Sequence, residues 1–71
     1  MPKIGEVYLR TDDVKVTVFD DEGHLMPSYG GPFREVARRI LQDAPQTARF
    51  YLANLGVASK EQITREQFAN S

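Results

Sequence analysis

The chain has 71 residues, of which 41% are hydrophobic and 27% are charged, and its formal net charge is −1. These values are typical of a folded globular domain, and the length predicts one small domain, residues 1–71, that buries only about 60% of its unfolded surface. The absence of cysteine excludes disulfides, thiolate zinc sites, iron–sulfur clusters and thiol nucleophiles.

Nothing in the composition predicts contact with a membrane. No apolar run approaches the roughly 18 residues that span a bilayer, and Glu6 stands where a signal peptide would need a continuous apolar stretch. We therefore expect a cytoplasmic protein.

Residues 4–26 are predicted to form an antiparallel hairpin or meander. Glu6–Arg10 alternates between polar and apolar side chains, and a polar turn, 11–13, separates it from a second alternating run. In that second run, the residues expected on the inner face are Val14, Val16 and Val18.

A second turn and a short third strand are expected next. Asp20, Asp21 and Glu22 precede Gly23, which suits the left-handed position of a tight turn. His24–Met26 is then predicted as a short strand, and residues 27–31 as a flexible connection.

The first predicted helix spans residues 32–43. Pro32 is acceptable in the first turn of a helix, and the apolar residues that follow recur with helical spacing along one face. These residues are Phe33, Val36, Ala37, Ile40 and Leu41.

Two further helices are expected, at 45–55 and 59–69. The first has an apolar stripe, a capping pattern of Asp43 with Gln46, and Gly56 as a C-terminal cap. The second has the overlapping capping patterns Ser59 with Gln62 and Thr64 with Gln67. The predicted fold is therefore α+β, with a small antiparallel sheet of two or three strands followed by two or three short helices.

The sequence predicts neither catalysis nor a metal or cofactor. No motif combines a nucleophile, a base and an orienting acid, and His24 is the only histidine. The acidic cluster Asp20, Asp21 and Glu22 lacks the ligand spacing of a calcium loop, so we expect a solvated turn.

A binding role is therefore expected, and the sequence offers two candidate surfaces. Arg34, Arg38 and Arg39 could present a basic helix face to nucleic-acid phosphates, although Glu35 can pair with two of them. The other surface is the hairpin, whose open edge at Glu6–Arg10 or His24–Met26 could accept a partner strand. The residues predicted to bind a protein partner are Glu6, Tyr8, Arg10, Asp20, Asp21, Glu22, Tyr29 and Phe50.

The chain is small, lacks cysteine, has a predicted helical second half and contains two strand segments, Val7-Tyr8-Leu9-Arg10 and Val14-Lys15-Val16-Thr17-Val18. In these features it resembles small bacteriophage-encoded regulators that bind host RNA polymerase. The resemblance implies a non-enzymatic role, inhibition or antitermination of bacterial transcription through polymerase subunits, and it assigns a role to no individual residue. The alternatives are a nucleic-acid-binding module that uses the arginines of the first helix, and an accessory or toxin-neutralising subunit of a larger complex. Self-association also stays open.

Overall fold

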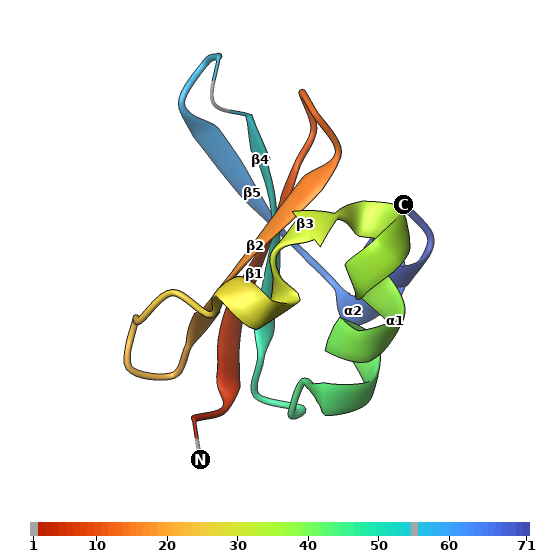
Figure 1. Ribbon diagram of the computed structural model, residues 1–71. Helices are drawn as coiled ribbons and strands as arrows, with labels where there is room; N and C mark the ends of the chain where they lie inside the picture. Colours follow the sequence, from red (N-terminus) through yellow and green to blue (C-terminus); the bar gives the residue numbers. More distant parts are fainter. Residues whose placement is uncertain (1, 55) are drawn as a thin grey trace.

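The structure is a computed structural model that describes residues 2–54 and 56–71 (Figure 1). Within these residues the chain forms a mixed sheet and two α-helices, with one short 3-10 turn, η1. In chain order the elements are β1 (Ile4–Arg10), β2 (Lys15–Asp20), η1 (Pro27–Tyr29), β3 (Gly31–Pro32), α1 (Phe33–Asp43), β4 (Arg49–Asn54), β5 (Ser59–Ile63) and α2 (Arg65–Ala69).

The five strands lie in the order β3-β2-β1-β4-β5. β1 pairs with β2 in an antiparallel hairpin, and α1 then returns the chain to the other side of β1, where β4 runs parallel to it. β4 and β5 form a second antiparallel hairpin. The N-terminal strand is therefore the centre of the sheet.

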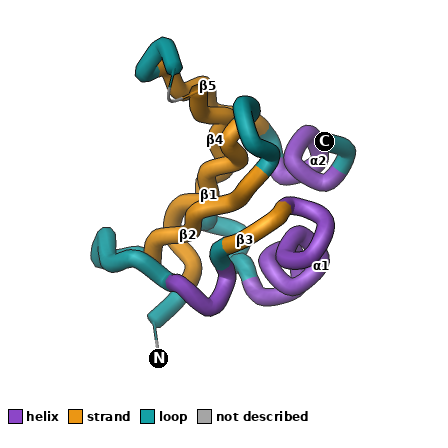
Figure 2. The backbone as a smooth tube through the Cα atoms, turned by 45° about the horizontal axis from the view of Figure 1, so that its top comes forward, coloured by secondary structure: helices purple, strands orange, loops and turns teal. Residues whose placement is uncertain are grey.

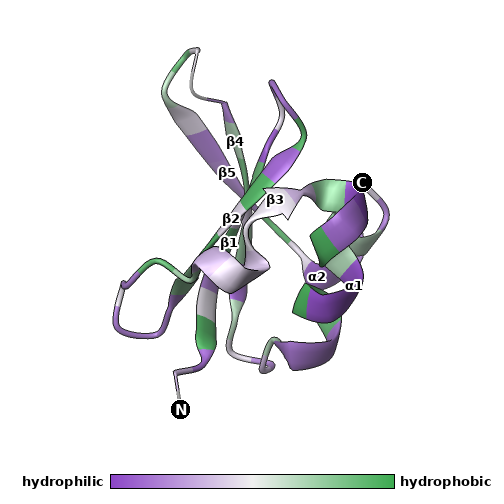
Figure 3. Ribbon diagram, in the orientation of Figure 1, coloured by the Kyte–Doolittle hydropathy of each residue, from purple (hydrophilic) through white to green (hydrophobic). Residues whose placement is uncertain are grey.

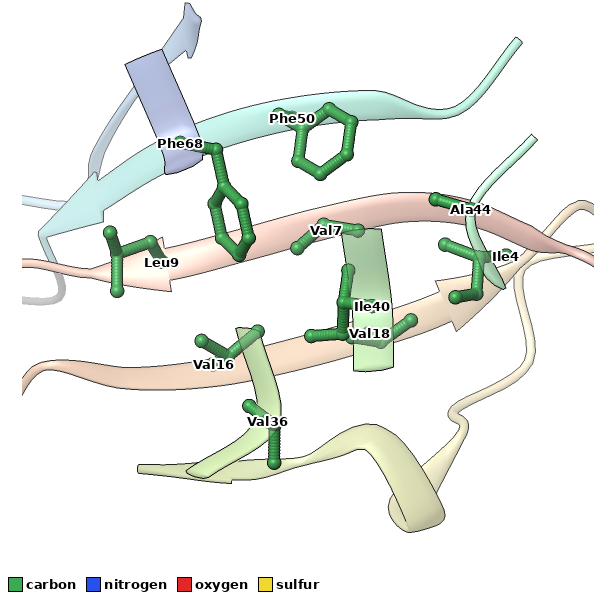
Figure 4. Packing of buried hydrophobic residues seen from close by; sticks show 10 residues of the cluster. All are labelled: Ile4, Val7, Leu9, Val16, Val18, Val36, Ile40, Ala44, Phe50 and Phe68. Carbon is green, nitrogen blue, oxygen red and sulfur yellow. The ribbon is translucent and has the colours of Figure 1, made fainter. Parts of the chain in front are cut away.

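Both helices pack against the same face of the sheet (Figures 1 and 2). The apolar stripe of α1 turns toward the strands and its polar residues turn away (Figure 3). Side chains from β1, β2 and β4 meet those of α1 and α2 in one core, in which Phe68 contacts Phe50 at a ring-centroid distance of 4.9 Å (Figure 4). The buried core residues are Ile4, Val7, Leu9, Val16, Val18, Val36, Ile40, Ala44, Phe50 and Phe68.

The side chain of Arg65 joins the two helices. Its guanidinium donates to the backbone carbonyls of Leu41, Ala44 and Pro45 at 3.1, 2.9 and 2.8 Å. These carbonyls lie at or just beyond the end of α1, where carbonyls lack helical partners and a positive charge is favourable. The same guanidinium lies 5.4 Å from the centroid of the Phe50 ring.

The predicted α+β class is confirmed, while the sheet has more strands than expected and is mixed. The predicted hairpin is present, but Val14 does not lie on its inner face. Val14 is 53% exposed and occupies the turn with φ of 55°. Its carbonyl accepts a hydrogen bond from the amide of Phe33 at 3.0 Å, which supplies a partner for the first turn of α1.

The prediction of a helix at 45–55 is wrong. Arg49–Asn54 is a strand, in which Phe50 turns into the core while Tyr51 turns to the opposite face. Pairing with β1 on one side and β5 on the other satisfies its backbone groups. The expected capping by Asp43 is also wrong, because that residue ends α1. Leu55 lies outside the described residues.

The predicted helix at 59–69 is half correct. Ser59–Ile63 is a strand, so the capping pattern of Ser59 with Gln62 is wrong. The capping box of Thr64 with Gln67 is confirmed, and it begins α2.

The connections also differ from expectation. His24–Met26 is not a strand, because Leu25 forms only an isolated bridge with Phe19. The connection at 27–31 contains η1 and the first residue of β3. The first helix matches its prediction except for Pro32, which lies at its N-cap and pairs with Lys15. No helix among the described residues is long and apolar enough to cross a membrane.

Candidate functional site

The face of the sheet opposite the helices is covered by no helix of the described chain, and we call it the open face (Figure 2). Because side chains alternate along a strand, it is built from the residues between the core positions. In rows across the sheet, these residues are Phe19, Glu6 and Arg49; then Thr17, Tyr8, Tyr51 and Gln62; then Lys15, Arg10, Ala53 and Lys60.

Aromatic side chains occupy the middle of the open face. Tyr8 and Tyr51 are register partners on parallel strands, and their rings stack at 5.0 Å with an interplanar angle of 14°. Phe19 meets Tyr8 edge-on at 5.7 Å. All three side chains are only partly buried. The sheet therefore presents an aromatic surface that no described helix covers.

Lysine and arginine side chains share the open face with these rings. The ammonium of Lys60 lies 4.9 Å from the centroid of Tyr51 and 5.5 Å from that of Tyr8. The Nη2 atom of Arg49 forms an ion pair with Oε2 of Glu6 at 3.2 Å. The open face holds four of the nine basic residues of the chain and one of its ten acidic residues. It is thus positive in a protein whose net charge is −1.

A shallow hollow of about 360 Å³ lies within the open face. Three neighbouring strands contribute to it: β2, β1 and β4. The residues that line it are Tyr8, Arg10, Thr17, Phe19 and Ala53.

Asp13 orients the arginine of this hollow. Its carboxylate accepts hydrogen bonds from Nε and Nη2 of Arg10, the first at 3.1 Å. The Arg10 hydrogen bond lowers the pKa of Asp13, and the backbone amide of Lys15 adds to this effect. The carboxylate therefore stays ionised and holds the plane of the guanidinium.

Of the predicted partner-binding residues, Glu6, Tyr8 and Arg10 lie together on the open face. They do not lie on an open edge, because β1 is paired on both sides. Phe50 is 2% exposed and belongs to the core, so its prediction as a contact residue is wrong.

Asp20 is the last residue of β2, and Asp21 and Glu22 lie in the turn that follows, so none of the three belongs to the open face. Asp20 is buried, and its carboxylate accepts the backbone amides of Glu22 and His24 at 2.9 and 2.8 Å. The hydrogen bond from the His24 amide is the main cause of the lowered pKa of Asp20. The side chains of Asp20, Glu22 and His24 are close enough to share a cation. Because Asp20 already caps the turn, these contacts explain the cluster without a ligand.

Tyr29 is also separate from the open face. Its hydroxyl donates to Asp43, which raises the pKa of Tyr29, and its ring lies 5.3 Å from the guanidinium carbon of Arg39. Arg39 in turn donates to the carbonyl of Ser28. These contacts hold η1 against α1 and give Tyr29 a structural role.

Phe19 and Lys60 were not predicted as site residues, and Tyr51 was considered as a docking residue only on a helix. Phe19 could have been found, since it alternates with Val16 and Val18 in a strand that was predicted. Tyr51 and Lys60 lie on strands predicted as helices, so their common face was not visible.

Comparisons with protein-family models, with curated proteins and with solved structures find no match for this chain. The case for its function therefore depends on the geometry of the open face.

Proposed function

We propose that this domain binds single-stranded nucleic acid across the open face of its sheet. The observation that carries the proposal is the aromatic group Phe19, Tyr8 and Tyr51, bordered by cations on a face that no described helix covers. Unpaired bases stack on aromatic side chains, and lysine and arginine neutralise the phosphates. The proposed role is binding without catalysis.

The positions of the cations fit a chain of phosphates. Arg10 pairs with Ala53, and Ala53 with Lys60, so the two cations lie in one row across the sheet. Lys15 continues this row on β2, because it directly precedes Val16, which pairs with Leu9. At a strand spacing of about 4.8 Å, this row spans roughly 14 Å. Several successive phosphates can therefore meet positive charge.

The ion pairs on this face do not prevent binding. Arg10 and Arg49 are both partly exposed, and exposed pairs contribute only about 0–1 kcal/mol. A phosphate can replace or share such a partner at small cost. Lys60 lies over the tyrosine rings and forms no ion pair with a described residue, so it is available to a phosphate next to a stacked base.

Fluorescence anisotropy with labelled single-stranded oligonucleotides tests the proposal. With three lysine or arginine contacts to phosphates, we expect the logarithm of the association constant K to fall linearly with the logarithm of the salt concentration, with a slope of about −2. Tyr51→Thr, which keeps a residue suited to a strand, should weaken binding by about tenfold. Lys60→Gln should weaken binding and make the slope shallower by about 0.7. Titrations with RNA and with DNA strands of the same sequence identify the preferred sugar. A duplex should bind more weakly because its bases are already paired.

The matched control is Arg34→Gln with Arg38→Gln on α1, which removes two exposed cations on the other side of the sheet. This variant should bind as the parent does. If only the α1 variant loses affinity, the arginines of the helix form the binding site instead. Absence of binding by the parent protein would reject the proposal.

The polymerase-regulator role implied by the resemblance remains a separate proposal, and one observation bears on where a protein partner would bind. The outer edge of β5 has no partner strand among the described residues. Strand addition would therefore favour Ser59–Ile63, the longer of the two outer strands, rather than β1. Capture of polymerase subunits by the domain, abolished by Gln62→Pro but unaffected by Tyr51→Thr, would favour this alternative.

A further inference from the structure

The hollow in the open face has a volume and a lining that suit one flat ring. Its volume of about 360 Å³ is at the lower end of the range of small-molecule sites, about 300–1,000 Å³. Ala53 contributes only a methyl group between the much larger side chains of Arg10 and Lys60, which are its cross-strand partners. The small side chain at this position is what leaves the space open.

The lining offers both stacking surfaces and hydrogen-bonding groups. Tyr8 and Arg10 are two residues apart on β1, so their side chains stand on the same face about 7 Å from each other. A planar ring can stack on an aromatic side chain or on a guanidinium plane. The hydrogen bonds to Asp13 hold the guanidinium in place before a ligand arrives. The Thr17 hydroxyl can donate or accept a hydrogen bond.

We infer that this hollow is a nucleobase site that receives one unpaired base of the bound strand. The inference rests on the proposed function and adds that different parts of the open face bind the base and the phosphates. The base enters between Tyr8 and Thr17 and stacks on the Arg10 guanidinium. The positive charges of Arg10 and of its row neighbours, Lys15 on β2 and Lys60 on β5, face the flanking phosphates. Binding therefore has a salt-dependent part from these three cations and a part that depends on the base in the hollow.

Ala53→Leu tests this division because it fills the hollow without changing any charge. We expect about tenfold weaker oligonucleotide binding, with the same slope of log K against log salt as the parent. The matched control is Ala69→Leu, which makes the same exchange at an exposed position of α2, outside the open face. It should leave the affinity within about twofold of the parent.

An oligonucleotide that lacks its bases gives a second readout on the folded parent protein. It should bind more weakly than the intact strand, and Ala53→Leu should not weaken it further. Should Ala53→Leu fail to fold, Thr17→Val removes the hydroxyl from the hollow with a residue that favours strands. It should then lower affinity for the intact strand without changing affinity for the strand without bases.

The outcomes separate the two proposals. If the parent protein binds no oligonucleotide, the proposed function fails, and the base site with it. If the parent binds, but a folded Ala53→Leu variant binds the intact strand equally well, the base site is rejected while the proposed function stands. Equal weakening of intact and base-free strands by Ala53→Leu would also reject the base site.

Discussion

The inward and open faces of the sheet are made by alternate residues of the same strands, and they differ in chemistry and exposure. Along β2, Val16 and Val18 are buried beneath α1, while Thr17 and Phe19 between them are partly exposed. Along β4, Phe50 is buried and Tyr51 is not. A sheet with helices on only one side is usually polar on the other side. Here the other side keeps three aromatic rings and a row of cations, which supports the proposal that it is a binding surface.

The largest expected effect compares one buried residue with its exposed neighbour. Val16→Asp places a charge under α1 and should cost several kcal/mol, comparable with the whole stability of a domain of this size. Thr17→Asp places the same charge on the open face and should leave the domain folded. Urea unfolding monitored by circular dichroism measures both. A cooperative transition of parental stability in Val16→Asp would show that the two faces are assigned wrongly.

The second prediction concerns the layer that covers the inward face. Arg65→Met removes three hydrogen bonds to the end of α1 and should lower the free energy of unfolding by about 1–3 kcal/mol. Lys60→Met removes a cation from the open face and should change stability by less than about 0.5 kcal/mol. Thermal unfolding compares the two. Equal losses would mean that Arg65 contributes no more than an ordinary surface cation.

These contrasts also explain which parts of the structure could be predicted from the sequence. The hairpin and α1 were predicted because their periodicity is unambiguous over a local stretch. The segment at 45–55 fits both a helical stripe of Ala48, Tyr51 and Leu52 and the alternation of a strand. Its strand state depends on pairing with β1, which is distant in sequence, and no local pattern carries that information.

The site, like the fold, could be predicted only where its strands have a clear local pattern. Tyr8 and Arg10 were predicted as contact residues on a strand that was itself predicted correctly. Tyr51, Ala53 and Lys60 join them only because β4 and β5 extend the sheet beyond β1. The open face therefore follows from tertiary pairing rather than from a sequence motif.

The third prediction concerns the turn at the cationic end of the open face. Val14 adopts a left-handed backbone conformation that is unfavourable for a β-branched residue, and its side chain is mostly exposed. Val14→Gly should therefore raise the free energy of unfolding by about 1 kcal/mol. Thermal unfolding is the measurement, and Val57→Gly in the other hairpin loop is the control for simple loss of an exposed valine. A lower stability in Val14→Gly would show that the valine side chain itself supports the fold.

The smallest expected effect is on acid stability. Hydrogen bonding to backbone amides lowers the pKa of Asp20 in the folded state, so its stabilising contribution is present above the unfolded-state pKa of about 3.9. This contribution is lost as the pH falls through the lower, folded-state pKa. Asp20→Asn should be less stable than the parent at neutral pH, and the difference should shrink below about pH 4. Urea unfolding as a function of pH measures this, and a difference independent of pH would reject the role of the ionised carboxylate.

The most direct test of the open face as the binding surface is a two-dimensional ¹H–¹⁵N NMR titration with a single-stranded oligonucleotide. We expect the amide signals of Tyr8, Thr17, Tyr51 and Lys60 to shift together as the strand is added. The exposed face of α1, marked by the amides of Arg34 and Arg38, should stay unchanged. Shifts confined to α1, or no shifts at all in low salt, would contradict this expectation.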